Sequence, residues 1–126
     1  MNSAIKDFET SKSFEIAKRF IGKEVEVVMD RPLGSLHPRH GFVYEANYGY
    51  LPGIKSPDGE DLDAYFLGTD KPLEKATGIV IAIIHRLNDD DDKLVVAPPG
   101  MKFTDAEIDK ATFFNEQWFK HEIYRV

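Results

Sequence analysis

Four carboxylate side chains lie within six residues of one short segment, and they are the strongest candidates for chemistry in this chain. They are Asp58, Glu60, Asp61 and Asp63. Like charges at this density repel each other, and a bound cation relieves the repulsion. Hard oxygen ligands in a chain without cysteine favour Mg²⁺ or Mn²⁺, with Ca²⁺ as a further alternative. The spacing does not fit an EF-hand loop, and a solvated acidic turn is the competing interpretation.

A second acidic segment, Asn88–Asp92, follows later in the chain and ends directly before Lys93. On its own, such a run is typical of a solvated turn. Lys93, however, opens a predicted strand, which would hold its ammonium group at the rim of a barrel. If the two acidic segments face each other across one cavity, they could form a multi-metal centre. Such a centre suits phosphoryl chemistry, because cations neutralise the substrate and activate a water.

Further candidates are two tyrosines on either side of a glycine, a short cationic cluster and a lysine near the C-terminus. They are Tyr48 and Tyr50, then His37, Arg39 and His40, and finally Lys120. Alternation along the chain could place one tyrosine in a pocket and the other in the core, and the cationic cluster could bind an anion. Taken singly, each of these side chains also fits a structural or solvent-exposed role. No histidine pair has metal-site spacing, and no Ser/His/Asp arrangement is evident.

Length and charge narrow the class of protein. With 126 residues, we expect a single domain over residues 1–126, of which 1–12 would form a loose arm. The net charge of −6 argues against nucleic acid as a partner, because phosphate binding needs a basic face. The longest apolar run, Ile79–Ile84, is too short to span a membrane. No signal peptide is apparent, so a cytoplasmic location is expected.

Hydrophobic periodicity predicts the elements that would position these side chains. We expect a helix over 13–21 and strands over 24–30, 41–46, 62–68, 77–86 and 93–97. The glycines and prolines of residues 47–61 indicate an ordered functional loop. Thr104 and Glu107 form a capping-box pattern, and the helix that they begin is expected to run to about residue 123 and to pack Trp118 on the sheet. Five short strands with an N-terminal and a C-terminal helix predict an α+β chain, mainly β, built as a small closed barrel.

Three segments together resemble the soluble metal-dependent inorganic pyrophosphatases. They are Asn47-Tyr48-Gly49-Tyr50, then Asp58-Gly59-Glu60-Asp61-Leu62-Asp63, and the acidic turn before Lys93-Leu94-Val95. The resemblance implies a five-stranded oligonucleotide-binding-type (OB-like) barrel with flanking helices. It implies hydrolysis of pyrophosphate to two phosphates with Mg²⁺, or Mn²⁺ as an alternative, in a homo-oligomer. It involves neither nucleic acid nor a membrane.

The same resemblance implies roles for individual residues. The implied metal ligands are Asp58, Glu60, Asp63, Asp89 and Asp91, where Asn88 is the alternative to Asp89. The implied catalytic residues are Glu60, as base for the attacking water, with Tyr48 and Lys93. The implied phosphate ligands are Arg39, Lys93, Lys120 and Tyr48. Asp30 matches a family glutamate, and Phe119-Lys120 stands where the family has a Tyr-Lys pair.

The chain departs from the family in ways that bear on the substrate. Glu60 replaces an aspartate, and Asp61 replaces a proline. The hairpin that carries a phosphate-gripping lysine and arginine shrinks to Pro32–Phe42, which leaves Arg39 and its neighbours as substitutes. The first hypothesis is therefore an Mg²⁺-dependent pyrophosphatase. The alternative is a pyrophosphatase-like barrel that binds metal or a phosphorylated ligand, or hydrolyses another phosphoanhydride, with little pyrophosphatase turnover. A nucleic-acid-binding barrel is a weaker third hypothesis.

Overall fold

The computed structural model describes residues 12–87 and 91–125, and its longest strand, β4 (Lys75–Arg86), closes the sheet into a barrel. The other barrel strands are β1 (Glu24–Arg31), β2 (Asn47–Lys55), β3 (Asp61–Phe66) and β5 (Lys93–Ala97). Their order is β1-β2-β3-β5-β4, and β4 pairs back to β1. Strands β3 and β5 run parallel, whereas the other described pairs are antiparallel. The predicted OB-like barrel with helices is confirmed.

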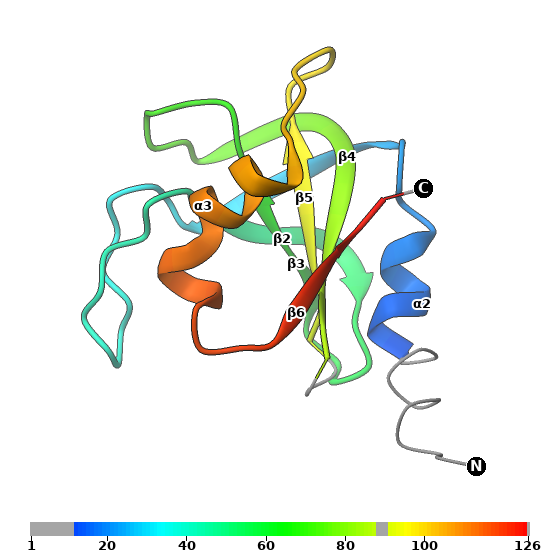
Figure 1. Cartoon of the computed structure of the whole chain (residues 1–126), viewed down its shortest axis with the longest axis horizontal. Helices are drawn as coiled ribbons and strands as arrows, with labels where there is room; N and C mark the ends of the chain where they lie inside the picture. Colours follow the sequence, from blue (N-terminus) through cyan, green and yellow to red (C-terminus); the bar gives the residue numbers. More distant parts are fainter. Residues whose placement is uncertain (1–11, 88–90, 126) are drawn as a thin grey trace.

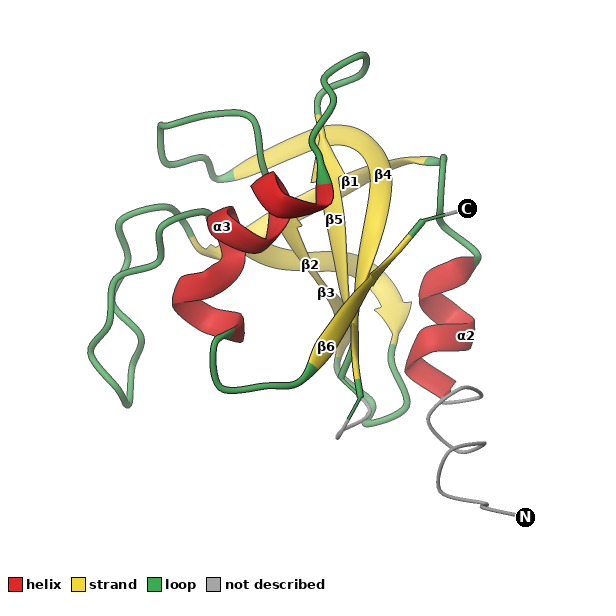
Figure 2. Cartoon of the chain, in the orientation of Figure 1, coloured by secondary structure: helices red, strands yellow, loops and turns green. Residues whose placement is uncertain are grey.

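Two helices cover different sides of this barrel, as Figures 1 and 2 show. Helix α2 (Lys12–Lys18) contributes Phe14 and Ala17 to the interior cluster, to which all five barrel strands contribute buried side chains. Helix α3 (Asp105–Glu116) packs Ile108 and Phe114 against the outer face of β3, β4 and β5. Strand β5 is buried along its whole length because both of its faces are covered.

The second strand lies later in the chain than the sequence indicated. Residues 41–46 do not form a strand and make only one bridge, between Leu36 and Val43, whereas Asn47–Lys55, predicted to be a loop, is β2. Pro52 and Gly53 suggested a loop, but they lie where regular pairing has ended: the last residue of β2 paired with β1 is Tyr50. The partner ladder with β3 is also irregular between Tyr50 and Lys55. A proline costs no ladder hydrogen bond there.

The C-terminal helix begins as predicted and ends earlier. The Thr104–Glu107 capping box is present, but α3 ends at Glu116 and β6 (His121–Tyr124) follows. Strand β6 pairs with the last four residues of β4 outside the barrel. This non-local pairing prevails over helical periodicity, so Trp118 is 59% exposed instead of packed on the sheet, and Lys120 lies between α3 and β6 instead of on the helix.

The arm predicted over residues 1–12 lies mostly outside the described residues, since only Lys12 belongs to α2. Within the described part of the chain, no helix is long and apolar enough to cross a membrane.

Candidate functional site

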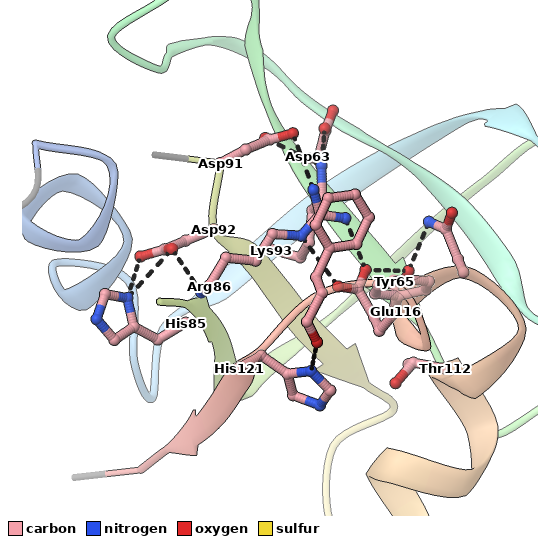
Figure 3. A network of polar contacts seen from close by, with 12 residues as sticks. Asp63, Tyr65, His85, Arg86, Asp91, Asp92, Lys93, Thr112, Glu116 and His121 are labelled. Atoms are coloured by element: carbon pink, nitrogen blue, oxygen red, sulfur yellow. Dashed lines mark hydrogen bonds and ion pairs between the residues drawn. The ribbon is translucent and has the colours of Figure 1, made fainter. Parts of the chain in front are cut away.

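Lys93 joins the two acidic segments at one mouth of the barrel. Its Nζ lies 2.6 Å from Asp63 Oδ2 and 3.0 Å from Asp91 Oδ1 (Figure 3). The hydroxyl of Tyr48 donates a hydrogen bond to the same Asp63 oxygen, at 2.8 Å. Residues far apart in the sequence, and singled out there as candidates, are therefore in direct contact.

The strand register explains this contact. Strands β3 and β5 are parallel and pair Ala64 with Leu94, so Asp63 and Lys93, one residue earlier in each strand, lie side by side. In the antiparallel ladder between β2 and β3, Tyr48 faces Tyr65, two residues beyond Asp63 on the same side of the strand. Two ladders thus bring a phenol, a carboxylate and an ammonium group to one point.

Burial fixes the charge state of the phenol in this cluster. The pKa of Tyr48 is well above its usual value because the hydroxyl is buried, and because the charge of Asp63 and the hydrogen bond to it favour the neutral phenol. Tyr48 therefore stays a hydrogen-bond donor across the physiological pH range. The Lys93 side chain is 3% exposed, and a buried ammonium group needs the two carboxylates beside it.

A second polar cluster, which sequence reasoning missed, surrounds Arg86 at the end of β4. Its Nε and Nη2 donate to the two oxygens of Glu116, at 3.0 and 3.2 Å, and its Nη1 lies 3.5 Å from Asp91 Oδ2 (Figure 3). The hydroxyl of Tyr65 donates to Glu116 Oε2 at 2.6 Å, and the guanidinium carbon lies 3.7 Å from the ring centre of Phe119. Through Asp91, this cluster adjoins Lys93.

A signal for this cluster was present in the sequence. Ile108, Thr112 and Glu116 recur at four-residue spacing on α3, and all three are at most 1% exposed. A polar residue on the apolar stripe of a helix calls for a buried partner. The partner, Arg86, is the charged residue that ends the apolar run of β4. Sequence alone does not show that these two elements meet.

Asp63, in the Lys93 cluster, also lines a small acidic cavity. Its volume is about 260 Å³, and its lining residues are Asp30, Tyr50, Lys55, Gly59, Glu60, Asp61 and Asp63. Asp61 is paired with Lys55 at 2.8 Å. Asp58 turns toward its own loop, where its Oδ1 accepts hydrogen bonds from the Ser56 hydroxyl and the Glu60 amide. These two hydrogen bonds lower the pKa of Asp58.

The chemistry of the acidic cavity fits a divalent cation. Partial desolvation of its carboxyl raises the pKa of Asp30, although the residue is exposed, and the nearby charge of Asp63 adds to this rise against the opposing charge of Arg31. A cation would offset this accumulated negative charge, and carboxylates are the ligands that Mg²⁺ prefers. Within the described residues, no three acidic or histidine side chains already converge as a metal site. Binding therefore requires side chains of this cavity to close around the ion.

Lys93, with Tyr48 and Asp91, also lines a larger cavity of about 630 Å³. Its lining residues are His37, His40, Phe42, Tyr44, Tyr48, Arg86, Asp91, Lys93, Asn115, Gln117, Trp118 and Phe119. Arg86 and Lys93 supply its cationic groups, and rings make up most of the remaining lining. Tyr48 and Lys93 belong both to this lining and to the contact with Asp63, so the acidic and aromatic cavities adjoin each other.

The structure gathers some of the predicted site residues and leaves others apart. Tyr48, Glu60, Asp63, Asp91 and Lys93 lie at the barrel mouth, in the clusters and cavities described above. Asp58 lies exposed on the adjoining loop. The side chains of Arg39 and Lys120 are exposed and line neither cavity, while His37 and His40 occupy the place expected for Arg39. Asp89 lies outside the described residues.

The closed barrel with flanking helices and the clustered acids define a class of fold, the pyrophosphatase-like barrel. Similar solved structures include the inorganic pyrophosphatase from Ehrlichia chaffeensis, with a TM-score of 0.66 and 15% identity over 84% of this chain and 88% of that one. The enzyme from Helicobacter pylori gives a TM-score of 0.63 and 19% identity over 81% and 84%.

The inorganic pyrophosphatase from Neisseria gonorrhoeae gives a TM-score of 0.58 and 20% identity over 86% of this chain and 78% of that one. No protein-family model matches the chain, and a search of curated proteins finds no match. At these identities the likeness shows the fold alone.

Proposed function

We propose that this chain hydrolyses inorganic pyrophosphate, or a related phosphoanhydride, with the help of Mg²⁺. The observation that carries the proposal is the contact of Lys93 with both Asp63 and Asp91, at 2.6 and 3.0 Å. This contact joins an acidic cavity suited to cations to a cavity with cationic groups suited to phosphate. A phosphoanhydride hydrolase needs both halves side by side. The similar folds of solved inorganic pyrophosphatases support the same class of reaction.

Each of the two cavities has a proposed role. Asp58, Glu60, Asp63 and the acids of the 89–91 turn would hold Mg²⁺, with Mn²⁺ as an alternative. When bound, the metal neutralises phosphate charge and lowers the pKa of a bound water. Glu60 is exposed at the edge of the acidic cavity and would accept the proton of the attacking water. Lys93 would hold a phosphate oxygen, and Tyr48 would keep Asp63 in place through its hydrogen bond.

A second candidate function is ligand binding with little turnover. It is favoured by the pairing of Arg86 with Glu116 and by the position of Arg39 outside both cavities. A cation already balanced by carboxylates binds phosphate less strongly than an unbalanced one, and it stabilises the transition state less. Mg²⁺-dependent ligand binding by calorimetry, together with no phosphate release over hours, would favour this function over the first. A cytoplasmic homo-oligomer stays a prediction under either function.

The first prediction tests the hydrolase directly. In Asp63→Asn, phosphate release from pyrophosphate with Mg²⁺ should fall at least about 100-fold, because the variant loses a carboxylate of the acidic cavity and a partner of Lys93. A colorimetric phosphate assay measures the rate. The matched control is Asp70→Asn, which removes an exposed acid that lines neither cavity and should keep the rate. If a folded Asp63→Asn protein hydrolyses pyrophosphate like the parent chain, the site assignment is wrong.

A further inference from the structure

The larger cavity has a lining that inorganic pyrophosphate does not require. Seven of its twelve lining residues carry a ring: His37, His40, Phe42, Tyr44, Tyr48, Trp118 and Phe119. Pyrophosphate is a small, strongly hydrated anion with no apolar surface, so aromatic walls offer it nothing. At about 630 Å³, the cavity has the size of sites that enclose organic ligands.

The aromatic wall is arranged around an exposed indole. Trp118 is 59% exposed, and its ring centre lies 5.4 Å from that of Phe42 at an interplanar angle of 39°. Phe42 in turn lies 4.7 Å from His37. An exposed tryptophan beside further rings is the kind of surface on which proteins stack flat heterocycles. The ring residues come from three parts of the chain: the 32–46 connection, strand β2 with Tyr48, and the residues after α3.

The polar end of the cavity holds two cationic groups beside one carboxylate. Arg86 and Lys93 line it, nearly buried at 5% and 3% exposure, together with Asp91, which pairs with both and which a phosphate would have to displace or meet through Mg²⁺. In the aromatic wall, His37 adds a neutral donor, because its Nδ1 accepts hydrogen bonds from the amides of Arg39 and His40, at 3.1 Å each. The remaining hydrogen of the neutral ring is then on Nε2. Burial and the neighbouring cations His40, Arg31 and Arg39 lower the pKa of His37, which agrees with a neutral ring.

We propose that the ligand of this cavity is an organic phosphoanhydride that carries a flat ring, of the nucleoside diphosphate class. Its base would lie against Trp118 and Phe42, and its phosphates would lie toward Arg86 and Lys93, next to the acidic cavity. This inference rests on the proposed function and specifies its substrate. In the reaction, water adds to the terminal phosphorus and the bond from that phosphorus to the bridging oxygen breaks. The products are the nucleoside monophosphate, inorganic phosphate and one proton, which Glu60 accepts.

Binding can be measured apart from turnover because Trp118 is the only tryptophan in the chain. We would titrate the full chain, with Mg²⁺, with the α,β-methylene analogue of ADP and separately with methylenebisphosphonate, which lacks the ring. The nucleotide analogue should quench the Trp118 emission saturably and bind at least about tenfold more tightly than the bisphosphonate, which is the usual contribution of one stacked base.

Two variants then separate stacking from other effects. Measured by calorimetry, Trp118→Ala should bind the nucleotide analogue about tenfold more weakly than the parent chain does and should bind the bisphosphonate with unchanged affinity. The matched control is Phe113→Ala, which removes an aromatic side chain of similar exposure, 61%, that does not line this cavity. It should change neither affinity. Both side chains are exposed, and a thermal melt of each variant confirms folding.

The inference is overturned if the bisphosphonate binds as tightly as the nucleotide analogue, if neither ligand binds, or if Trp118→Ala affects both ligands equally. It is also overturned if the Trp118 emission responds to protein concentration and not to nucleotide, since Trp118 would then lie between copies of the chain. Phosphate release from ADP and pyrophosphate is assayed in parallel. Nucleotide binding without any phosphate release would uphold the ligand class and reject the hydrolase.

Discussion

At the barrel mouth, Lys93 is 3% exposed and pairs with Asp63 and Asp91, and Arg86 is 5% exposed and pairs with Glu116 and the same Asp91. Charges buried to this degree persist only when each one is paired and hydrogen-bonded. Asp91 therefore couples the two cations. A ligand that pairs with either cation therefore changes the ion pairs of both.

The predictability of these residues depends on how local their signals are. Asp58, Glu60 and Asp63 stand out because like charges crowd one short segment. Arg86 and Glu116 do not stand out, because each looks ordinary in its own segment and only the packing of α3 on β4 brings them together. The acids could therefore be predicted from the sequence, and this cation and its partner could not.

His121 gives a prediction at the scale of one side chain, away from the barrel mouth. Its Nδ1 lies 3.0 Å from the carbonyl oxygen of Phe119, and its Nε2 lies 2.9 Å from Asp109 Oδ1. Both partners accept hydrogen bonds, so only the protonated ring, with a hydrogen on each nitrogen, satisfies both. Burial lowers the pKa of His121, but the hydrogen bonds to Asp109 and Phe119 outweigh it and raise the pKa above its ordinary 6.5.

A raised pKa in the folded state means that the stabilisation is fully present below pH 6.5 and is lost as the pH rises through the folded pKa. In Asp109→Asn, the free energy of unfolding should therefore fall by about 0.5 kcal/mol at pH 5.5 and hardly change at pH 9, since the pair is partly exposed. Urea unfolding at the two pH values measures this difference.

The control for this prediction is Asp105→Asn on the same helix. Asp105 pairs with Arg125 at 2.7 Å, and arginine keeps its charge throughout this range. The free energy of unfolding that Asp105→Asn loses should be equal at pH 5.5 and pH 9. Equal losses for Asp109→Asn as well would contradict a protonated His121.

At the scale of elements, strand β2 shows what local patterns miss. Its burial alternates through Asn47, Gly49 and Leu51 as in any strand, yet Pro52 and Gly53 suggested a loop. Strands β1, β4 and β5 were predictable because their apolar patterns are uninterrupted. Strand β6 was not, because its formation depends on the free edge of β4 at Ile83–Arg86. Elements that exist through non-local pairing are the ones that sequence periodicity cannot show.

The contact between β1 and β2 leads to a prediction about stability. A Cβ at Gly49 would collide with the backbone of Val28 and Met29 across the ladder. Gly49→Ala should lower the free energy of unfolding by about 2 kcal/mol, within the range of overpacked cores, and the Tm by roughly 5–10 °C. A thermal melt followed by circular dichroism measures it.

Gly100→Ala is the comparison for Gly49→Ala. Its Cβ would meet nothing within 4 Å, but its φ of +83° costs an alanine about 1 kcal/mol. The Gly49 variant should therefore be the less stable of the two. A Gly49→Ala protein that melts with the parent chain would show that β1 and β2 can separate without cost, contrary to this close approach.

At the scale of the whole molecule, the barrel brings negative charge from two separate segments to one end. The acidic cavity collects Asp30 from β1, Glu60 from the connection to β3 and Asp63 from β3 itself, in a chain with a net charge of −6. The charge raises the electrostatic cost of folding at this end. The proposed cation would lower this cost, and the stability of the fold should then depend on it.

Mg²⁺ should accordingly stabilise the folded chain. A ligand at a hundredfold excess over its Kd adds about 2.7 kcal/mol to the free energy of unfolding, so the Tm should rise by on the order of 10 °C on saturation and return with EDTA. Sodium chloride at equal ionic strength controls for screening of charge. Asp70→Asn should keep the Mg²⁺ response, while Asp63→Asn should lose most of it. Because this measurement involves no substrate, a Tm that follows ionic strength alone would reject the metal site whatever the chain hydrolyses.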